Sequence, residues 1–208
     1  MGKYKAVGFD YGGVIGGGSK VGNDFNFEMS KTLGVTVEEY RDLYFSMNHM
    51  INTGRVETWE EFWPLFLDKL GKLEKLTEVL ALKDKYAKLY IRMNDEVISL
   101  IDRLRKNSYK VGLLSNATLD NGIQMREKKL HKHFDAFHIS AETGLQKPQP
   151  LAFELFANEL GVKLPELIFV DDAEMSLSAS KVCGFTPILF KNYDQLISDL
   201  ELLSVATR

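Results

Sequence analysis

The chain has a single cysteine, few prolines and no long apolar run. Of its 208 residues, one is cysteine and five are proline. One cysteine excludes a disulfide within the chain and is typical of proteins from a reducing compartment. A membrane-spanning helix needs about 20 consecutive apolar residues, which no stretch of this sequence approaches, and the first residues carry no apolar secretory segment. We therefore expect a cytoplasmic protein with no membrane partner.

The sequence also lacks an excess of positive charge. Its 26 Lys and Arg residues are outnumbered by 29 Asp and Glu residues, so the formal net charge is −3. Nucleic-acid-binding domains usually carry a basic face or stripe, and we therefore expect no nucleic-acid partner. Hydrophobic residues make up 45% of the chain. This content is enough to bury the core of one large domain, or of a domain with an insertion.

Signals for strands and helices alternate at the start of the chain and again after position 94. A short apolar run predicts the first strand near Tyr4–Phe9. Further strands are predicted at Lys110–Leu114, Phe137–Ile139, Leu167–Val170 and Thr186–Phe190, and helices at Val97–Leu104, Leu151–Leu160, Ser176–Val182 and Tyr193–Leu203. Strands separated by helices form a parallel sheet with right-handed crossovers. The expected fold class is therefore α/β, with a Rossmann-like core made of residues 1–15 and 95–208.

The segment 16–94 shows only helical signals. Apolar residues recur in it at helical spacing, and Thr36 and Thr58 are each followed three residues later by a glutamate, the pattern of a capping box. Helix ends are marked by three glycines and a proline that should kink or end its helix: Gly34, Gly54, Gly71 and Pro64. We expect an all-helical cap inserted after the first strand, with the glycines at 16–18 as its hinge.

Polar residues follow three of the predicted strands. Asp10 follows the first strand, Ser115-Asn116 the second and Asp171-Asp172 the fourth. Parallel strands end at a common edge, where open α/β sheets bind their ligands, and Lys147 lies on a loop that can return there. Carboxylate oxygens suit Mg²⁺, which often shares its ligand shell with a substrate phosphate. An aspartate at this edge can attack phosphorus, and a lysine can offset the phosphoryl charge.

Each of these residues has a purely structural interpretation when it is taken alone. An aspartate after a strand often forms a turn, and the two polar pairs can cap helices. The glycines after Asp10 also suggest a phosphate loop, but that loop needs lysine before the hydroxyl residue, whereas this chain has Ser19-Lys20. The occurrence of all the polar residues at matching strand ends favours a functional site.

Four short motifs, in this order and with this strand context, resemble those of the haloacid dehalogenase (HAD) superfamily. They are Phe9–Val14, Leu113–Asn116, Gln146–Pro148 and Phe169–Asp172. The helical insertion directly after the first motif resembles the small cap of the branch that contains phosphatases and haloacid dehalogenases. The resemblance implies an HAD-like hydrolase, and most simply a Mg²⁺-dependent phosphatase that acts on a small phosphorylated metabolite through an aspartyl-phosphate.

The resemblance also implies the catalytic residues. Asp10 would be the nucleophile. Ser115 and Asn116 would bond the oxygens of the transferring phosphoryl group, and Lys147 would balance its charge.

The metal ligands are implied in the same way. Asp10 would bind Mg²⁺ together with the backbone carbonyl of Gly12. Asp171 and Asp172 would hold the ion directly or through water, and we favour Asp172 as the closer ligand.

Gly12 departs from the pattern of phosphatases in this family, which usually place an aspartate there to protonate the leaving group and then activate water. General acid–base help contributes roughly 10²–10⁴-fold to a rate. A catalytically impaired protein that binds a phosphorylated ligand or a partner is therefore one alternative. A metal-independent haloacid dehalogenase is another, because those enzymes also lack the second aspartate, but they typically replace the acidic pair kept here as Asp171-Asp172.

Overall fold

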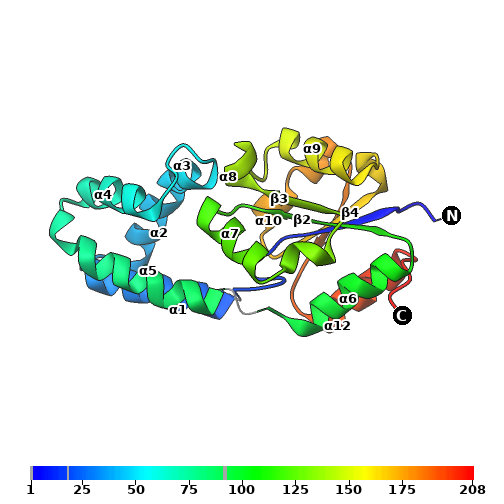
Figure 1. The fold of residues 1–208 in the computed structure, drawn as a ribbon, viewed down its shortest axis with the longest axis horizontal. Coiled ribbons are helices and arrows are strands. Elements are labelled where there is room, and N and C mark those ends of the chain that lie inside the picture. The colour runs from blue at the N-terminus through cyan, green and yellow to red at the C-terminus, as the bar shows by residue number, and fades with distance from the viewer. Residues whose placement is uncertain (1, 18, 91–92) are drawn as a thin grey trace.

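A parallel β-sheet forms the centre of the larger body of the protein (Figure 1). The computed structural model describes residues 2–17, 19–90 and 93–208. Within these residues the sheet has five strands, in the order β3 (Ala136–Ile139), β2 (Lys110–Ser115), β1 (Ala6–Phe9), β4 (Leu167–Asp171) and β5 (Thr186–Leu189). Every neighbouring pair is parallel. The predicted α/β class with a Rossmann-like sheet is confirmed.

Helices cover both faces of the sheet. An apolar cluster on one face contains side chains from α6 (Asp95–Lys106), α7 (Leu119–Glu127) and α12 (Tyr193–Leu202). A second cluster on the other face contains side chains from α9 (Pro150–Leu160). Figure 1 shows α6 and α12 below the sheet and α9 above it. Shorter helices complete this body: α8 (Ser140–Thr143), α10 (Glu174–Leu177), α11 (Ser180–Cys183), and the 3₁₀ turns Leu130–His133 and Leu164–Glu166.

Two glycines let α9 approach the sheet closely. A Cβ atom at Gly8 or at Gly112 would lie 2.6 Å from the ring of Phe156, so a larger residue at either position would displace that ring. Phe156 is fully buried, and burial of a phenylalanine side chain stabilises a fold by about 1.5–3 kcal/mol. The two glycines, in neighbouring strands, thus leave room for the ring of Phe156 near the centre of α9.

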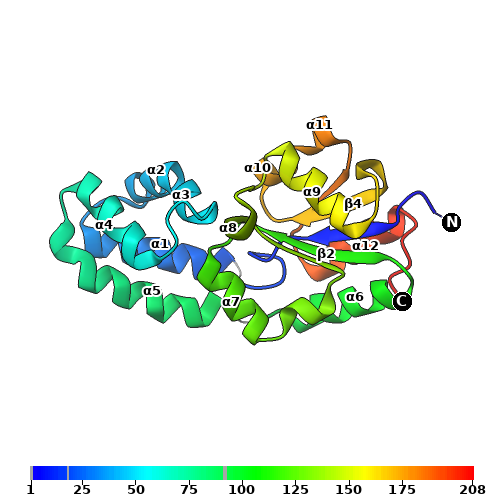
Figure 2. The same cartoon turned by 45° about the horizontal axis from the view of Figure 1, so that its top comes forward.

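The remaining helices form a smaller body beyond the carboxyl ends of the strands (Figure 2). They are α1 (Ser19–Leu33), α2 (Val37–Met47), α3 (His49–Asn52), α4 (Trp59–Leu70) and α5 (Leu76–Tyr90), with a 3₁₀ turn at Leu73–Lys75. Their apolar side chains form a cluster of their own, with Trp63 and Tyr40 fully buried in it. The chain enters and leaves this body side by side, because the Asn94 N–H donates to the Ile15 carbonyl (2.7 Å) and Gly16 bridges to Met93. The boundaries 16 and 94 of an inserted cap stay a prediction.

Short sequence patterns correctly predicted several ends of the helices in the smaller body. Thr36 and Glu39 form the predicted capping box, with bonds of 3.1 and 2.7 Å. Thr58 accepts from the Glu61 N–H, but the Glu61 carboxylate accepts from Glu57 rather than from Thr58, so only half of that box forms. The three expected stop glycines follow α1, α3 and α4 with positive φ angles: Gly34, Gly54 and Gly71.

Some details of the helices differ from the sequence expectations. Of the two outcomes expected at Pro64, a kink or a helix end, the helix end does not occur, since α4 continues to Leu70. The helix expected at Ser176–Val182 is two short helices, α10 and α11, interrupted near Ser178. Helix α7 was not predicted, because Leu119–Glu127 is mostly polar and contains Gly122, which hides any helical period of apolar residues.

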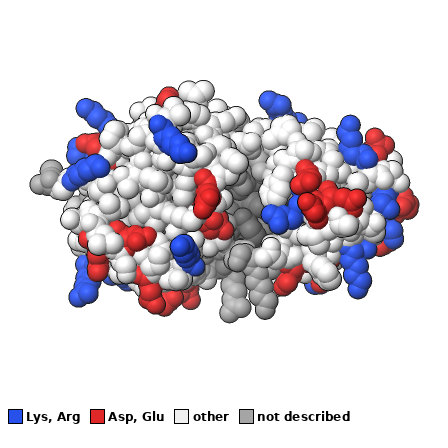
Figure 3. Space-filling view, turned by 180° about the vertical axis from the view of Figure 1, so that it is seen from behind, with Lys and Arg blue, Asp and Glu red and all other residues white. Residues whose placement is uncertain are grey.

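The surface carries charges of both signs. Figure 3 shows acidic and basic side chains scattered over the face opposite to that of Figure 1, with neither sign forming a continuous stripe. Among the helices in the described ranges, none is both long enough and apolar enough to cross a membrane.

Candidate active site

The carboxyl ends of β1, β2 and β4 bring the predicted polar residues to one edge of the sheet. Phe9 of β1 pairs with Val170 of β4, so the next residue along each strand places Asp10 beside Asp171. The Asp10 N–H donates to the Val170 carbonyl at 2.8 Å, which continues the ladder by one step. Ser115 ends β2 on the other side of β1 and is buried. The register of the sheet therefore brings these residues together.

A buried lysine joins two of the carboxylates. Lys147 Nζ lies 2.8 Å from Asp10 Oδ1 and 2.5 Å from Asp171 Oδ2. The side chains of Lys147 and Asp171 are 1% and 0% exposed, whereas that of Asp10 is 13% exposed. Asp10 is thus the member of this triad that an incoming ligand can reach.

Burial and like charge act against the ionised form of Asp10. Burial raises the pKa of Asp10, the Lys147 ammonium lowers it, and the neighbouring Asp171 raises it again, with a net rise. Burial alone would lower the pKa of Lys147, but the two carboxylates that bond it outweigh burial and raise the pKa. Burial, followed by the charge of Asp171, also raises the pKa of Asp172. The site therefore gathers more negative charge than one lysine balances, which favours a further cation.

Asn116 holds the loop that carries the lysine. The Lys147 N–H donates to Asn116 Oδ1 at 2.8 Å, and Asn116 Nδ2 donates to the Lys147 carbonyl at 2.9 Å. These reciprocal bonds fix the backbone of Lys147 against the end of β2. The sequence does not reveal this contact, because nothing in the local pattern indicates that residues 116 and 147 meet. The phosphoryl-binding roles of Ser115 and Asn116 stay a prediction.

Asp10, Asp171 and Asp172 form a set of oxygen donors that suits a divalent metal ion. One carboxylate oxygen from each lies within 4.8 Å of the others. Asp171 already accepts the Ala173 N–H at Oδ1 (2.8 Å) and Lys147 at Oδ2. Asp172 is exposed by comparison, so its carboxylate is the more available of the pair. Hard oxygen ligands of this number and type fit Mg²⁺, which retains several waters.

Gly13 determines where the Asp172 carboxylate lies. Gly13 has a φ of +71°, and a Cβ atom on it would fall 1.9 Å from Asp172 Oδ2. The turn around it is closed by bonds from the Ile15 and Gly16 N–H groups to the Tyr11 carbonyl (2.9 and 2.8 Å). Gly12, two residues after Asp10, lies in this tight turn, and the turn packs against the acidic pair Asp171-Asp172. Only the structure shows that Gly13, the glycine next to Gly12, has no room for a side chain.

Gly13→Ala should weaken Mg²⁺ binding about 10–100-fold, because the new methyl group displaces a carboxylate of the donor set. Isothermal titration calorimetry with Mg²⁺ measures the effect. Gly71→Ala is the matched control, since Gly71 has a similar φ of +63° with nothing within 4 Å of the added Cβ. Equal Mg²⁺ affinity in both variants would contradict a ligand role for Asp172.

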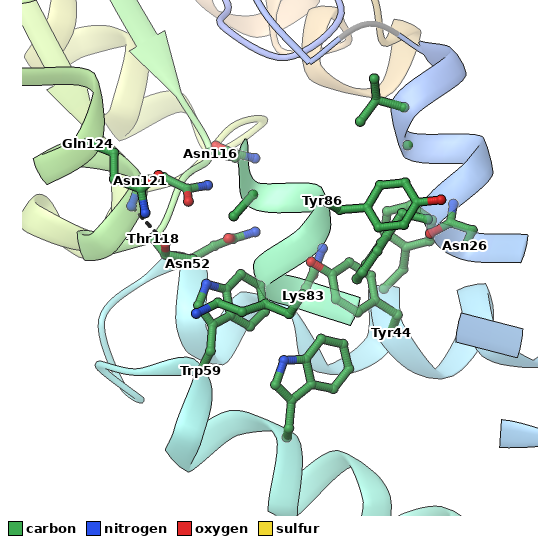
Figure 4. Close-up of a pocket in the computed structure, with 17 residues that line it drawn as sticks. Asn26, Tyr44, Asn52, Trp59, Lys83, Tyr86, Asn116, Thr118, Asn121 and Gln124 are labelled. Atoms are coloured by element: carbon green, nitrogen blue, oxygen red, sulfur yellow. Dashed lines mark hydrogen bonds between the residues drawn. The ribbon is translucent and has the colours of Figure 1, made fainter. Parts of the chain in front are cut away.

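A pocket of about 410 Å³ lies next to the site, between the helices of the smaller body and α7 (Figure 4). Asn116 lines it, together with Thr118 and Asn121 near the start of α7. On its other side Figure 4 shows Tyr44 from α2 and Tyr86 from α5. The pocket therefore meets the edge of the sheet at Asn116, which is hydrogen-bonded to the backbone of Lys147.

The chain is similar in sequence to a family of known proteins. A family model described as haloacid dehalogenase-like hydrolase matches residues 4–184. Among curated proteins, a 115-residue segment is 26% identical to bifunctional epoxide hydrolase 2 of Sus scrofa and covers 53% of this chain. That segment spans only 21% of the relative's length. An 84-residue segment is 31% identical to the glyceraldehyde 3-phosphate phosphatase of Methanopyrus kandleri, covering 40% of this chain and 36% of that protein.

Solved structures match over nearly the whole chain. An HAD family enzyme from Bacteroides thetaiotaomicron superposes with a TM-score of 0.71 at 19% identity, covering 95% of this chain and 99% of its own. The same enzyme has been solved in complex with magnesium and inorganic phosphate, and that structure superposes with a TM-score of 0.65. A predicted HAD-like family hydrolase from Porphyromonas gingivalis gives a TM-score of 0.69 at 24% identity, covering 96% of this chain and 98% of its own. At these identities the likeness shows the fold.

Proposed function

The chain belongs to the haloacid dehalogenase-like hydrolase family, and on that basis we propose that it is a Mg²⁺-dependent phosphatase of small phosphorylated metabolites. The observation that carries the proposal is the buried Lys147 ammonium bonded to both Asp10 and Asp171, with Asp172 completing a compact set of oxygen donors. Support also comes from the similar Bacteroides enzyme, whose structure contains magnesium and phosphate.

Asp10 would act as the nucleophile. Lys147 bonds its Oδ1, so the carboxylate is oriented before substrate arrives, and orientation of this kind lowers the barrier to attack. A bond forms from a carboxylate oxygen to phosphorus, and the bond from phosphorus to the ester oxygen breaks, so the leaving group departs with the electron pair. Water then attacks the aspartyl-phosphate and releases inorganic phosphate, which restores Asp10.

Other residues would stabilise the transferring phosphoryl group. Mg²⁺ bound by Asp10, Asp171, Asp172 and the carbonyl of Gly12 would neutralise charge on the phosphoryl oxygens. Lys147 adds positive charge at the same place without needing to reorganise, because its position is already fixed. Ser115 lies at the adjacent strand end, where its hydroxyl can donate to a phosphoryl oxygen.

Residues 16–94 would form a cap over a core made of residues 1–15 and 95–208. The two connections run side by side at Ile15-Gly16 and Met93-Asn94, so a rotation there would move the whole helical body. Gly17, with a φ of +67°, sits in this connection and can absorb such a change. Closure of a cap excludes water from the site during phosphoryl transfer.

A panel of phosphate esters, including aryl and acyl phosphates, tests the proposal. We expect phosphate release that requires Mg²⁺ and stops on chelation. Mg²⁺ should also stabilise the fold, by about 2.7 kcal/mol at a concentration 100 times its dissociation constant. Binding of Mg²⁺ and phosphate without turnover of any ester would instead support the phosphate-binding or partner-binding alternative. Chloride release from 2-chloro acids in the presence of chelator would support the dehalogenase alternative.

A further inference from the structure

A column of aromatic rings borders the pocket beside the candidate active site. Trp59 and Trp63 are stacked with centroids 5.6 Å apart and planes 18° apart. Trp63 and Tyr44 continue the column at 6.3 Å and 26°, and Tyr44 and Tyr40 at 5.9 Å and 21°. Tyr40 is fully buried at one end, whereas Trp59 is half-buried and lines the pocket at the other. Trp63 and Tyr44 line the pocket as well, so a planar ring bound there would contact the rings of this column, an arrangement that aromatic groups favour.

The polar groups of the pocket are mainly neutral amides. Asn52, Asn116 and Asn121 come from three separate segments and lie on the same side of it in Figure 4. A carboxamide both donates and accepts hydrogen bonds, so it can serve a hydroxyl or carbonyl substituent on a ring without demanding charge. Among the described lining residues there is no carboxylate, and the one charged side chain is Lys83.

The charge of Lys83 is already balanced. Its Nζ lies 3.1 Å from Asp84 and 3.9 Å from Glu60, and its side chain is 17% exposed. The pocket therefore offers mainly aromatic surface and neutral hydrogen-bonding groups, and its one cation already has carboxylate partners. Its chemistry suits an uncharged aromatic group better than a second phosphate, a carboxylate or an amine.

Gly12 bears on the same question. At neutral pH an alkoxide leaves poorly, because its parent alcohol has a pKa near that of water, about 15.7. A phenol, like the tyrosine side chain, has a pKa of about 10, so a phenolate can leave without a proton donor. An enzyme with glycine in place of the usual acid therefore loses the least rate on phosphate esters of phenols.

From the pocket and Gly12 together we infer that the substrate is an aryl phosphate, whose aromatic group carries no charge of its own and occupies the pocket while its phosphoryl group meets Asp10. The inference rests on the proposed phosphatase function. In the first step the bond between phosphorus and the phenolic oxygen breaks, phenolate leaves with the electron pair and takes a proton from water, and Asp10 gains the phosphoryl group. The aromatic ring needs no contact with a residue at position 12.

Two esters with the same ring separate the leaving-group argument from simple binding. Phenyl phosphate releases a phenolate, whereas 2-phenylethyl phosphate releases an alkoxide. We expect the wild-type kcat to be at least about 100-fold higher for phenyl phosphate than for 2-phenylethyl phosphate, because general acid catalysis contributes at least this factor to a rate. Gly12→Asp should raise kcat for 2-phenylethyl phosphate by about 100-fold or more and change that for phenyl phosphate much less. Gly12 is not among the described glycines with positive φ, so an aspartate there meets no left-handed backbone.

Substitution of the pocket tests the aromatic contact. Trp59→Leu should raise KM for phenyl phosphate about 3- to 10-fold, the value of one aromatic contact. It should leave KM for acetyl phosphate unchanged, because that substrate has a good leaving group but no ring. Phe27→Leu is the control, since Phe27 is 61% exposed and does not line this pocket. Circular dichroism and thermal unfolding verify that each variant folds.

The outcomes distinguish the two levels of the proposal. Two results would overturn the aryl phosphate inference but not the phosphatase function. One is that wild type turns over 2-phenylethyl phosphate as fast as phenyl phosphate, or faster. The other is that Trp59→Leu changes KM equally for phenyl phosphate and for acetyl phosphate. Hydrolysis of no ester and no acyl phosphate would overturn the phosphatase itself.

Discussion

Asp10→Asn should lower phosphate release by about 10⁴-fold or more and leave the protein at least as stable as wild type. The loss of activity follows because an amide cannot serve as the attacking nucleophile, and removal of a nucleophile costs an enzyme most of its rate enhancement. Stability should not fall, because burial and the charge of Asp171 both disfavour the ionised form of Asp10. Lys147 keeps its bond to Asp171 in the variant.

Two measurements decide this prediction. Phosphate release with Mg²⁺ reports the rate, and urea denaturation at pH 8 without metal reports the free energy of unfolding. Glu78→Gln serves as the control, since Glu78 is an exposed partner of Lys75 on a cap helix and both quantities should stay close to wild type. Retention of more than a small fraction of activity by Asp10→Asn would rule out the aspartyl-phosphate.

Lys147→Met should lower the free energy of unfolding by about 3–5 kcal/mol in metal-free protein. The variant leaves Asp10 and Asp171 without the buried cation that bonds both, and breaking a buried ion pair from one side costs about this much. It should also reduce phosphate release, because a fixed positive charge at the phosphoryl group is lost. Added Mg²⁺ should restore part of the stability by supplying a cation to the same carboxylates.

An exposed lysine offers a matched control for this prediction. Lys5 also bonds a carboxylate at 2.5 Å, that of Glu166, but its side chain is 53% exposed. Lys5→Met should therefore cost no more than about 1 kcal/mol. Equal destabilisation of the two variants would show that the buried ion pair contributes nothing beyond a surface pair. In the double variant Asp10→Asn/Lys147→Met, removal of one of the two facing carboxylates should recover part of the loss.

The sequence alone predicted the kind of fold and the site residues that gather at its edge. Short apolar runs separated by amphipathic helices are local patterns, and a parallel sheet made from them has only one edge at which all strands end. Asp10, Ser115 and Asp171 each follow such a run directly, so their meeting needed no knowledge of distances. Helix N-caps such as Thr36 could be predicted equally well from the sequence, because an N-cap hydrogen bond spans only three residues.

Only the tertiary structure decided what joins these residues. The pairing of Asn116 with the Lys147 backbone, the fit of Gly13 against Asp172 and the aromatic pocket all connect segments far apart along the chain. Helix α7, which lines that pocket, carries too weak an apolar period to be predicted, and it forms because it packs on the sheet. Local patterns determine which elements form and in what order. The contacts that give a site its charge balance and shape depend on long-range packing, which leaves no signature within a short stretch of sequence.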